Sequence, residues 1–476
     1  MAGTNLIGRE KERKNLSKFL KSKKSEFVAV YGRRRVGKTF LIKEFFDYKF
    51  DFYMSGLANA DTKQQLFNFD TELTKQSNLY YDSPSDNWLV AFQRLMAHLE
   101  TIDQSRKKII FIDELPWLDT HGTDFMIGLE HFWNTWATNR RDIILIVCGS
   151  AASWMTNELI NHTGGLHNRV TQRMKIEPFS LKETEEMLLS KNCVFDRYQI
   201  IQLYMCMGGM PYYLDAIESG MSATQNIQEL FFGPSAKLKN EFFNLYRSLF
   251  KKHETYEKIV ETLSTKTSGM LRNEIIKKSG LKSGGTLTKV LNDLEESGFI
   301  TSYIALDAKH KNTIYRLSDY YTSFYFNFIS QSKAKINDEW IHLMDHPSHR
   351  AWQGFTFEQV CLDHINPIKK ALGIHGILSN NASWIGNTEH KTAQIDLLID
   401  RRDHVINICK CKFSLDTFTI NKSYADNLRS KISVFKEVSQ TKKAVHLTMI
   451  TTYGVTDNQY KDMLVQNEIT MNDLFV

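Results

Sequence analysis

The chain of 476 residues is 42% hydrophobic and 24% charged, and its formal net charge is +6. This length exceeds what a single core supports, so we expect three or four domains. The longest apolar runs, such as residues 143–149, have the length of one buried strand, far short of the roughly 20 residues of a membrane-spanning helix, which excludes a membrane-embedded protein.

The N-terminus and the cysteines predict a cytoplasmic protein. Residues 1–16 are polar and charged and include no hydrophobic secretion segment. The six cysteines, scattered from residue 148 to residue 411, are too few for a disulfide framework and fit a reducing compartment. The basic excess permits a polyanionic partner without requiring one, and we expect no membrane partner.

Up to residue 180, short apolar runs alternate with amphipathic helical stretches. Such alternation predicts an α/β fold with a mostly parallel sheet and helices on both faces. The predicted strands lie within residues 26–32, 50–56, 107–114, 142–150 and 171–179.

The turn after the first predicted strand has the pattern Gly-x-x-x-x-Gly-Lys-Thr, and an apolar helical stretch follows it. Its glycines permit backbone angles that point successive N–H groups inward as an anion-binding nest, at the positive end of the helix. Lys38 would reach the β- and γ-phosphates of a nucleoside triphosphate, and the Thr39 hydroxyl would bind Mg²⁺. The predicted phosphate loop consists of Gly32, Arg33, Arg34, Arg35, Val36, Gly37, Lys38 and Thr39. Its three arginines either add positive field to the site or form a solvated basic turn.

Two further strand ends carry polar residues suited to the same site. Asp113 and Glu114 follow the apolar run 109–112. We expect Asp113 to hold Mg²⁺ and Glu114 to orient and polarise an attacking water. Ser150, which follows the run 143–149, either contacts the γ-phosphate or that water, or caps the next helix. The sequence therefore predicts a site for ATP with Mg²⁺.

Residues 1–245 resemble the archaeal and bacterial ATPase group of the AAA-like P-loop NTPases, near the STAND signalling ATPases. The matching motifs lie at residues 6–12, 32–39, 109–118, 148–155, 164–181 and 208–214. The resemblance implies that Gly8 and Arg9 lie beside the adenine and that Pro211 opens a lid helix over the nucleotide. It also makes Arg169 the candidate arginine that contacts the γ-phosphate, within one subunit or from a neighbouring one, with Arg173 as its rival.

The resemblance divides the chain into a P-loop ATPase core, residues 1–180, and three further domains. Ser180 followed by Glu183 is a capping-box start for a helical lid, residues 181–245. Residues 246–330 contain three helices and two strands, the pattern of a winged helix-turn-helix. Residues 331–476 complete the layout as a restriction-endonuclease-like α/β domain.

The predicted winged helix has an ambiguous charge pattern. Its third helix, residues 285–298, would normally enter a DNA major groove. That helix carries one lysine against three acidic residues, a poor fit to phosphates. The better basic features are Lys282 before the helix and the Lys-His-Lys segment at 309–311 on the expected wing tip. The module therefore binds either DNA or protein, and both alternatives stay open.

The last domain departs from the pattern of active restriction-like nucleases, which place an Asp on one strand and Glu-x-Lys on the next to hold Mg²⁺. Asp396 and Lys412 match this pattern, and Glu358 matches an upstream acid of the fold. Lys410, however, stands where the second carboxylate belongs, so the pocket loses a ligand and repels a divalent cation. We expect an inactive nuclease-like domain in which Asp396 pairs with Lys410 and Lys412. A role in binding a nucleic-acid backbone stays open.

These features favour a cytoplasmic ATP-binding ATPase that hydrolyses ATP to switch the position of its winged-helix and nuclease-like modules. One alternative is a DNA-acting defence or processing enzyme with an active nuclease domain. Another is a scaffold that binds ATP without turnover. The expected partners are ATP, DNA through the winged helix, and a second copy of the chain or another protein.

Overall fold

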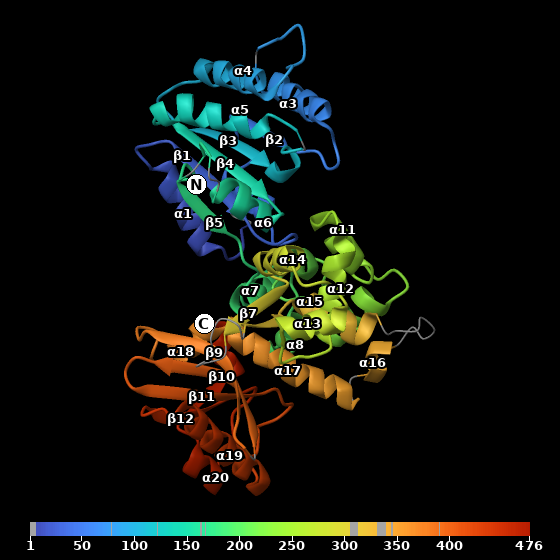
Figure 1. Cartoon of the computed structure of the whole chain (residues 1–476), viewed down its shortest axis with the longest axis vertical. Helices are drawn as coiled ribbons and strands as arrows, with labels where there is room; N and C mark the ends of the chain where they lie inside the picture. The colour runs from blue at the N-terminus through green and yellow to red at the C-terminus, as the bar shows by residue number, and fades with distance from the viewer. Residues whose placement is uncertain are drawn as a thin grey trace. The chain divides into compact units, whose positions relative to one another are not determined.

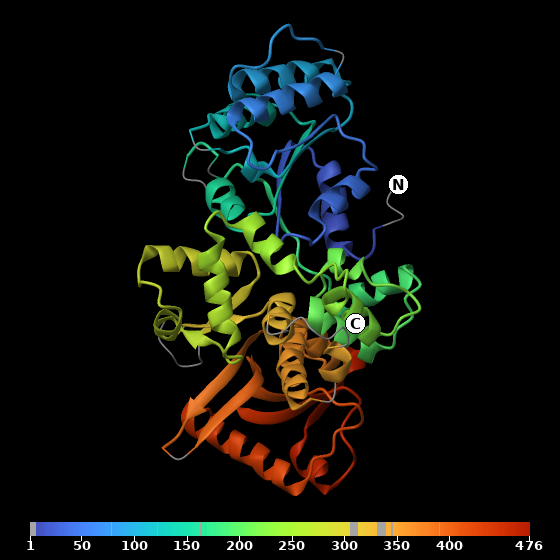
Figure 2. The ribbon, with the colours of Figure 1, turned by 90° about the vertical axis from the view of Figure 1, so that its right-hand side faces the viewer.

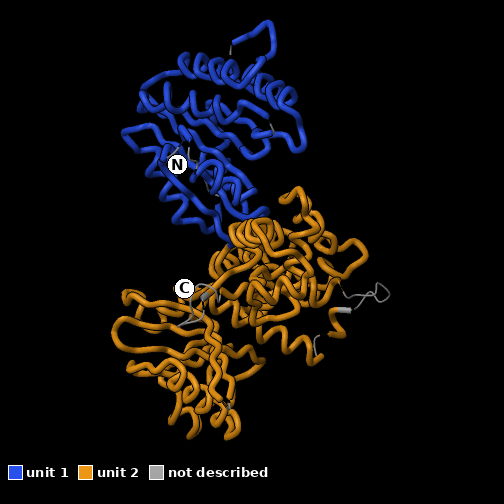
Figure 3. Tube along the Cα trace, viewed as in Figure 1, with its two compact units in different colours: residues 1–178 blue, residues 179–476 orange. Residues whose placement is uncertain are grey.

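The computed structural model describes residues 6–77, 79–120, 122–161, 164–166, 168–304, 313–330, 339–343, 346–389 and 391–476. The chain forms two compact units, Met1–Pro178 and Phe179–Val476 (Figure 3). Across the described ranges, no helix combines the length and the apolarity that crossing a bilayer would require.

The first unit is built on a five-stranded parallel sheet with the strand order β2-β3-β4-β1-β5 (Figure 1). The strands are β1 (Glu26–Tyr31), β2 (Phe52–Ser55), β3 (Lys108–Asp113), β4 (Ile143–Gly149) and β5 (Gln172–Lys175). The helices are α1 (Glu10–Leu20), α2 (Lys38–Phe45), α3 (Thr62–Gln76), α4 (Trp88–Thr101), α5 (Phe125–His131) and α6 (Ala152–Trp154). The α/β fold with a parallel sheet is thus confirmed, and each predicted strand is present.

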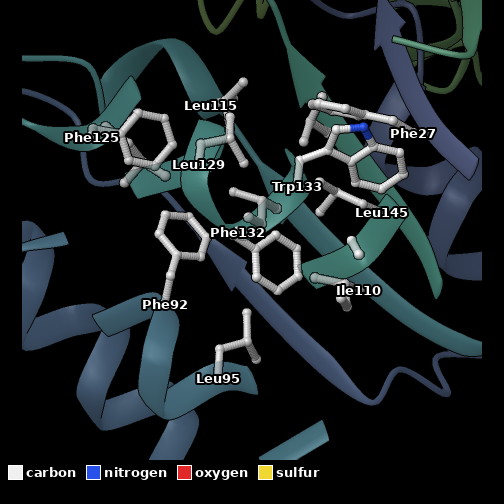
Figure 4. Packing of buried hydrophobic residues seen from close by; sticks show 14 of the residues in the cluster. Phe27, Phe92, Leu95, Ile110, Leu115, Phe125, Leu129, Phe132, Trp133 and Leu145 are labelled. Carbon is white, nitrogen blue, oxygen red and sulfur yellow. The ribbon is translucent and has the colours of Figure 1, made fainter. Parts of the chain in front are cut away.

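Helices cover both faces of this sheet, which is why its central strands are almost wholly apolar. Helices α3, α4 and α5 lie on one face and α1 on the other (Figures 1 and 2). On the first face, Phe92, Phe125 and Trp133 converge on Ile110 and Leu145 of the sheet, all at most 2% exposed (Figure 4). Each such side chain stabilises the fold by about 1.5–3 kcal/mol on burial. This core fixes the carboxyl ends of β1, β3 and β4, where the predicted site residues lie.

The second unit opens with a helical region. The capping box at Ser180 is confirmed: its Oγ accepts the Glu183 N–H at 3.3 Å, and the Glu183 carboxylate accepts the Ser180 N–H at 2.9 Å. Beside it, His364 Nε2 accepts the Leu181 N–H at 2.9 Å, and burial lowers the pKa of His364 to about 4, so the ring is neutral. The helices are α7 (Leu181–Ser190), α8 (Arg197–Met207), α9 (Pro211–Leu214), α10 (Ala223–Ile227) and α11 (Glu241–Leu249).

A small antiparallel sheet of order β6-β8-β7 follows, together with three helices. The elements are α12 (His253–Ser264), β6 (Met270–Leu271), α13 (Arg272–Ser279), α14 (Gly285–Glu296), β7 (Ile300–Ile304), β8 (Thr313–Leu317) and α15 (Tyr320–Phe324). The sequence predicts the three helices and the strands β7 and β8 but not the two-residue strand β6. The Lys-His-Lys segment at 309–311 lies outside the described residues. The identity of this part as a winged helix stays a prediction.

The last part is a five-stranded mixed sheet of order β13-β12-β11-β10-β9, in which β9, β10 and β11 are antiparallel neighbours. The elements are α16 (Glu339–Leu343), α17 (Pro347–Asp363), α18 (Ile365–Ala371), β9 (Ser379–Asn387), β10 (Thr392–Arg401), β11 (Val405–Lys412), α19 (Lys422–Ser439), β12 (Ala444–Thr451), α20 (Gln459–Leu464) and β13 (Asn467–Thr470). Leu428 and Phe435 of α19 share a core with Ile408 of β11. The nuclease-like identity of this sheet stays a prediction. The three domains predicted beyond residue 180 belong to one compact unit.

Candidate nucleotide-binding site

The phosphate loop connects the carboxyl end of β1 to the start of α2. Gly32, Arg35 and Gly37 have positive φ angles of 142°, 74° and 85°, the geometry that turns backbone N–H groups into a nest. Gly32 is also constrained sterically, because a Cβ there would meet the carbonyl oxygen of Ile176 after β5. Gly37 occupies the N-cap position of α2, so the first N–H groups of that helix face the loop. The loop therefore has the backbone of an anion site.

Lys38, the first residue of α2, is buried, and its ammonium group folds back over the loop. Nζ donates to the carbonyl oxygens of Gly32 at 3.0 Å and Arg33 at 2.9 Å. Burial lowers the pKa of Lys38, and the carboxylates of Glu114 and Asp113 beside it oppose this shift. The ammonium group is thus held against the nest, where phosphate oxygens would be stronger acceptors than these carbonyls.

The two predicted Mg²⁺ ligands lie in direct contact. Thr39 Oγ1 donates to Asp113 Oδ2 at 2.8 Å. Asp113, the last residue of β3, is 5% exposed and also accepts the N–H of Glu114 at 3.0 Å. A hydroxyl and a carboxylate oxygen beside a phosphate nest are the hard donors that Mg²⁺ prefers, so these residues fit the metal.

Glu114 and Ser150 form a pair that the sequence alone does not reveal. Ser150 Oγ donates to Glu114 Oε1 at 2.8 Å, and the Ser150 N–H donates to Oε2 at 3.4 Å. Glu114 has a φ of 48°, a left-handed conformation that costs a non-glycine residue about 1–2 kcal/mol. The helix-cap alternative for Ser150 is wrong, because Ala151 occupies the N-cap position of α6. Ser150 instead fixes the Glu114 carboxylate.

Arg9 braces the phosphate loop. Its side chain is buried, with Nη2 donating to the Val36 carbonyl at 3.0 Å and Nη1 to the Glu177 carbonyl at 2.6 Å. The guanidinium thereby ties the loop to the segment after β5. Gly8, which precedes it, has a φ of 59°. The place of both residues beside an adenine stays a prediction.

Two further buried side chains belong to the site. Arg33 is 7% exposed, which contradicts a fully solvated basic turn, whereas Arg34 and Arg35 are half-buried. Cys148 of β4 lies beside Asp113, and burial together with that carboxylate raises the pKa of the thiol, which is therefore neutral. The sequence offered no signal for Cys148 beyond its place near the end of an apolar strand.

Three residues named by the resemblance make none of the phosphate-loop contacts described above. Arg169 and Arg173 are exposed, so the guanidinium of either is accessible to a neighbouring molecule. Pro211 is the first residue of α9 and belongs to the second unit. The arginine and lid roles stay predictions.

A second charged cluster lies at the sheet of the second unit. Lys410 Nζ of β11 lies 2.5 Å from Asp396 Oδ2 of β10 and 3.5 Å from Glu358 Oε1 of α17. The expected ion cluster forms, but its third member is Glu358 rather than Lys412, whose ammonium lies 5.2 Å from the centre of the Tyr424 ring. Among the described residues, no group of three or more His, Cys, Asp or Glu side chains is placed to hold a metal ion.

The chain is similar to known proteins over most of its length. Residues 6–217 match a family model described as an ATPase domain predominantly from Archaea. An uncharacterized protein of Methanocaldococcus jannaschii is 25% identical over 398 residues, which span 82% of this chain and 83% of that protein. The family match and the geometry around Lys38 support an ATP-binding P-loop ATPase.

Solved structures also align with this chain. The Walker-type ATPase of Pyrococcus abyssi aligns over 68% of this chain and 96% of its own, with 16% identity and a TM-score of 0.48. The ORC2 protein of Aeropyrum pernix aligns over 72% of this chain and 96% of its own, with 12% identity and a TM-score of 0.43.

Proposed function

We propose that this protein is an ATPase that binds and hydrolyses ATP at the phosphate loop and thereby switches the position of the modules of its second unit. The observation that carries the proposal is the convergence of Lys38, the Thr39–Asp113 pair and the Glu114–Ser150 pair at the carboxyl ends of three parallel strands. A nest alone would suit any anion, but the two added pairs supply the acid–base and metal ligands that hydrolysis needs.

Each side chain has a role that follows from its position. Lys38 and the loop N–H groups would bind the β- and γ-phosphates, and Thr39 and Asp113 would hold Mg²⁺. Bound Mg²⁺ supplies charge neutralisation on the phosphates. Glu114, held by Ser150, would orient the attacking water and accept its proton. Arg169, which is exposed, would contribute charge from a second copy of the chain.

The switch requires that the modules contact the ATP-bound and ADP-bound states differently, because a ligand shifts an equilibrium only through its differential affinity. The phosphate loop is tied through Arg9 to Glu177, one residue from the end of the first unit. A change in loop geometry on phosphate release would therefore act directly on the chain segment that leads into the second unit.

Phosphate release and nucleotide binding test this proposal together. Lys38→Ala should abolish binding of ATP and ADP in calorimetry, and Glu114→Gln should retain binding but lose steady-state phosphate release by on the order of 1000-fold. Binding without turnover in the unaltered chain would favour the scaffold. Plasmid nicking with Mg²⁺ or Mn²⁺ that is lost in Asp396→Ala would favour the nuclease alternative.

A second candidate function is DNA binding through α14, and the orientation of its acids favours it. Asp293 is buried and accepts the Tyr256 hydroxyl at 2.6 Å. Glu295 accepts the N–H and the hydroxyl of Ser302 at 3.0 and 2.6 Å. Both carboxylates accept hydrogen bonds within the domain, which weakens the objection that the acidic residues of α14 would repel DNA phosphates. The exposed side chains of α14 are Thr286, Thr288, Lys289 and Asn292.

Mobility shifts in rising salt distinguish a DNA module from a protein module. Lys282→Gln combined with Lys289→Gln should weaken duplex binding and reduce the slope of log K against log salt by about 2, since each phosphate contact contributes about 0.9. The matched control is Lys251→Gln with Lys258→Gln, two exposed lysines of the same domain. Equal effects of the two double variants would refute a specific role for α14.

A further inference from the structure

A small cavity lies within the second unit, where residues 246–330 meet α17. Its volume is about 40 Å³, room for about three water molecules or for the polar head of a small ligand. The walls come from the end of α12, from β8, from α15 and from one stripe of α17. The side chains of that stripe recur at three- and four-residue spacing and therefore share one face of the helix: Trp352, Phe355, Thr356 and Gln359. All the lining residues belong to the second unit, whereas the phosphate loop belongs to the first.

Gln359 leaves a buried acceptor unused at this cavity. The side chain is 7% exposed, and its Nε2 donates to Asp363 Oδ1 at 2.8 Å. This bond fixes which way the amide points, because an ionised carboxylate accepts hydrogen bonds and cannot donate one to a carbonyl oxygen. Gln359 Oε1 is consequently left without a hydrogen-bond partner among the described residues. A buried acceptor in that state is destabilising, so the cavity favours a molecule that brings a donor.

Two donor groups lie on the same cavity. Trp352 is 6% exposed, and its Nε1–H has no acceptor in the ranges that the structure describes. Arg316 of β8 is half-buried, and within the described part of the chain its guanidinium makes no hydrogen bond or ion pair. Its charge reaches Glu358, but that carboxylate lies 3.5 Å from the Lys410 ammonium. The guanidinium is thus available to a carboxylate, whose two oxygens match its fork of N–H groups.

Charges of both signs line the cavity. Lys266 pairs with Glu274 at 2.8 Å, so Arg316 is the cation of the wall that a ligand can engage. Asp319 is buried on the wall and accepts the Thr322 N–H at 2.9 Å. Asp319 would repel a simple anion, whereas a molecule with a cation next to its carboxylate would be attracted by both Arg316 and Asp319. The wall therefore favours a zwitterion.

We propose that this cavity is a binding site for a free α-amino acid. The carboxylate binds Arg316 and the Trp352 Nε1–H, and the ammonium group donates to Gln359 Oε1 in the field of Asp319. Phe355, which is 40% exposed, marks the mouth through which the side chain of the amino acid extends. Because the cavity joins β8 to α17, an amino acid there links two parts of the second unit. The proposal does not depend on ATP hydrolysis.

The ligand chemistry can be tested on the unaltered full chain. The probes are the standard amino acids, and binding is measured as a saturable rise in melting temperature at constant ionic strength, followed by calorimetry. For the amino acid that binds best, the amide derivative lacks the carboxylate charge and the deaminated acid lacks the ammonium group, and each should bind about tenfold or more weakly. No stabilisation by any amino acid would overturn the proposal, since the cavity would then hold water only. Equal binding of the amide or of the deaminated acid would overturn the amino-acid assignment.

Two variants test the location of the site. Arg316→Gln removes the guanidinium, and affinity for the amino acid should fall about tenfold or more. The matched control is Arg402→Gln, an exposed arginine of the same unit that changes the net charge equally. Trp352→Phe removes the Nε1–H, keeps an aromatic ring and should weaken binding about three- to tenfold. Circular dichroism melts establish that each variant folds, and equal affinities in Arg316→Gln and Arg402→Gln would overturn the proposal.

Discussion

Replacing Ser150 with Ala should slow ATP hydrolysis about 10- to 100-fold while nucleotide affinity is unchanged. The substitution removes a 2.8 Å hydrogen bond to the Glu114 carboxylate and leaves the P-loop contacts of Lys38 intact. A hydrogen bond to a charged group contributes about 1.5–3 kcal/mol. If that energy serves to hold the carboxylate in its reactive orientation, its loss appears in the barrier, where about 1.4 kcal/mol is a factor of ten in rate.

Steady-state phosphate release at saturating ATP measures the rate, and calorimetry with ADP measures binding. A double-mutant cycle with Glu114→Ala isolates the route of the effect. Once Glu114 is absent, Ser150→Ala should change the residual rate by less than about twofold, because the serine has nothing left to orient. The same factor in both backgrounds would show that Ser150 acts directly on phosphate or water, and the orienting role would be refuted.

Three further predictions follow from the first unit. Gly32→Ala should lower the thermal stability far more than Gly122→Ala: both have positive φ, which costs about 1–2 kcal/mol, but only at Gly32 would the Cβ collide with the Ile176 carbonyl. Arg9→Ala should weaken ATP binding on the order of tenfold, measured by calorimetry, because the loop loses two hydrogen bonds; unchanged affinity would contradict the brace. The pKa of Asp142 is lowered from 3.8 to about 2, because hydrogen bonds and charges from neighbouring cations outweigh the effect of burial. Its contribution to the stability of the fold is therefore present above about pH 4 and is lost as the pH falls toward 2. Denaturant titrations at several pH values should show that the stability of Asp142→Asn depends less on acid than that of the unaltered chain.

The P-loop and its strand ends could be predicted because their chemistry is local. One turn carries the glycines and Lys38, and a parallel sheet brings the carboxyl ends of its strands to one edge, so Asp113 and Glu114 had to lie near that turn. The Ser150–Glu114 bond was beyond prediction, because it depends on the left-handed backbone at Glu114 and on the start of α6. The contact from Arg9 to Val36 depends similarly on how α1 packs.

Counting the charges of α14 does not show where its acidic side chains lie, and periodicity supplies part of the answer. Asp293 follows Val290 by three positions and precedes Leu294, so a helical repeat already puts it on the apolar face. A buried acid needs a donor, and the Tyr256 hydroxyl provides it. A helical or strand repeat does not show that Lys410 pairs with Glu358 and that Lys412 lies beside aromatic rings, because these partners come from different elements.

The left-handed backbone of Glu114 makes its stability depend on Ser150. Glycine would adopt the φ of 48° without steric cost, so Glu114→Gly would relieve about 1–2 kcal/mol of strain, but it would also remove the hydrogen bonds from Ser150. The serine therefore offsets at least part of what this backbone conformation costs. A lineage that loses Ser150 would leave the strain at Glu114 uncompensated, so we expect the two residues to be kept or lost together.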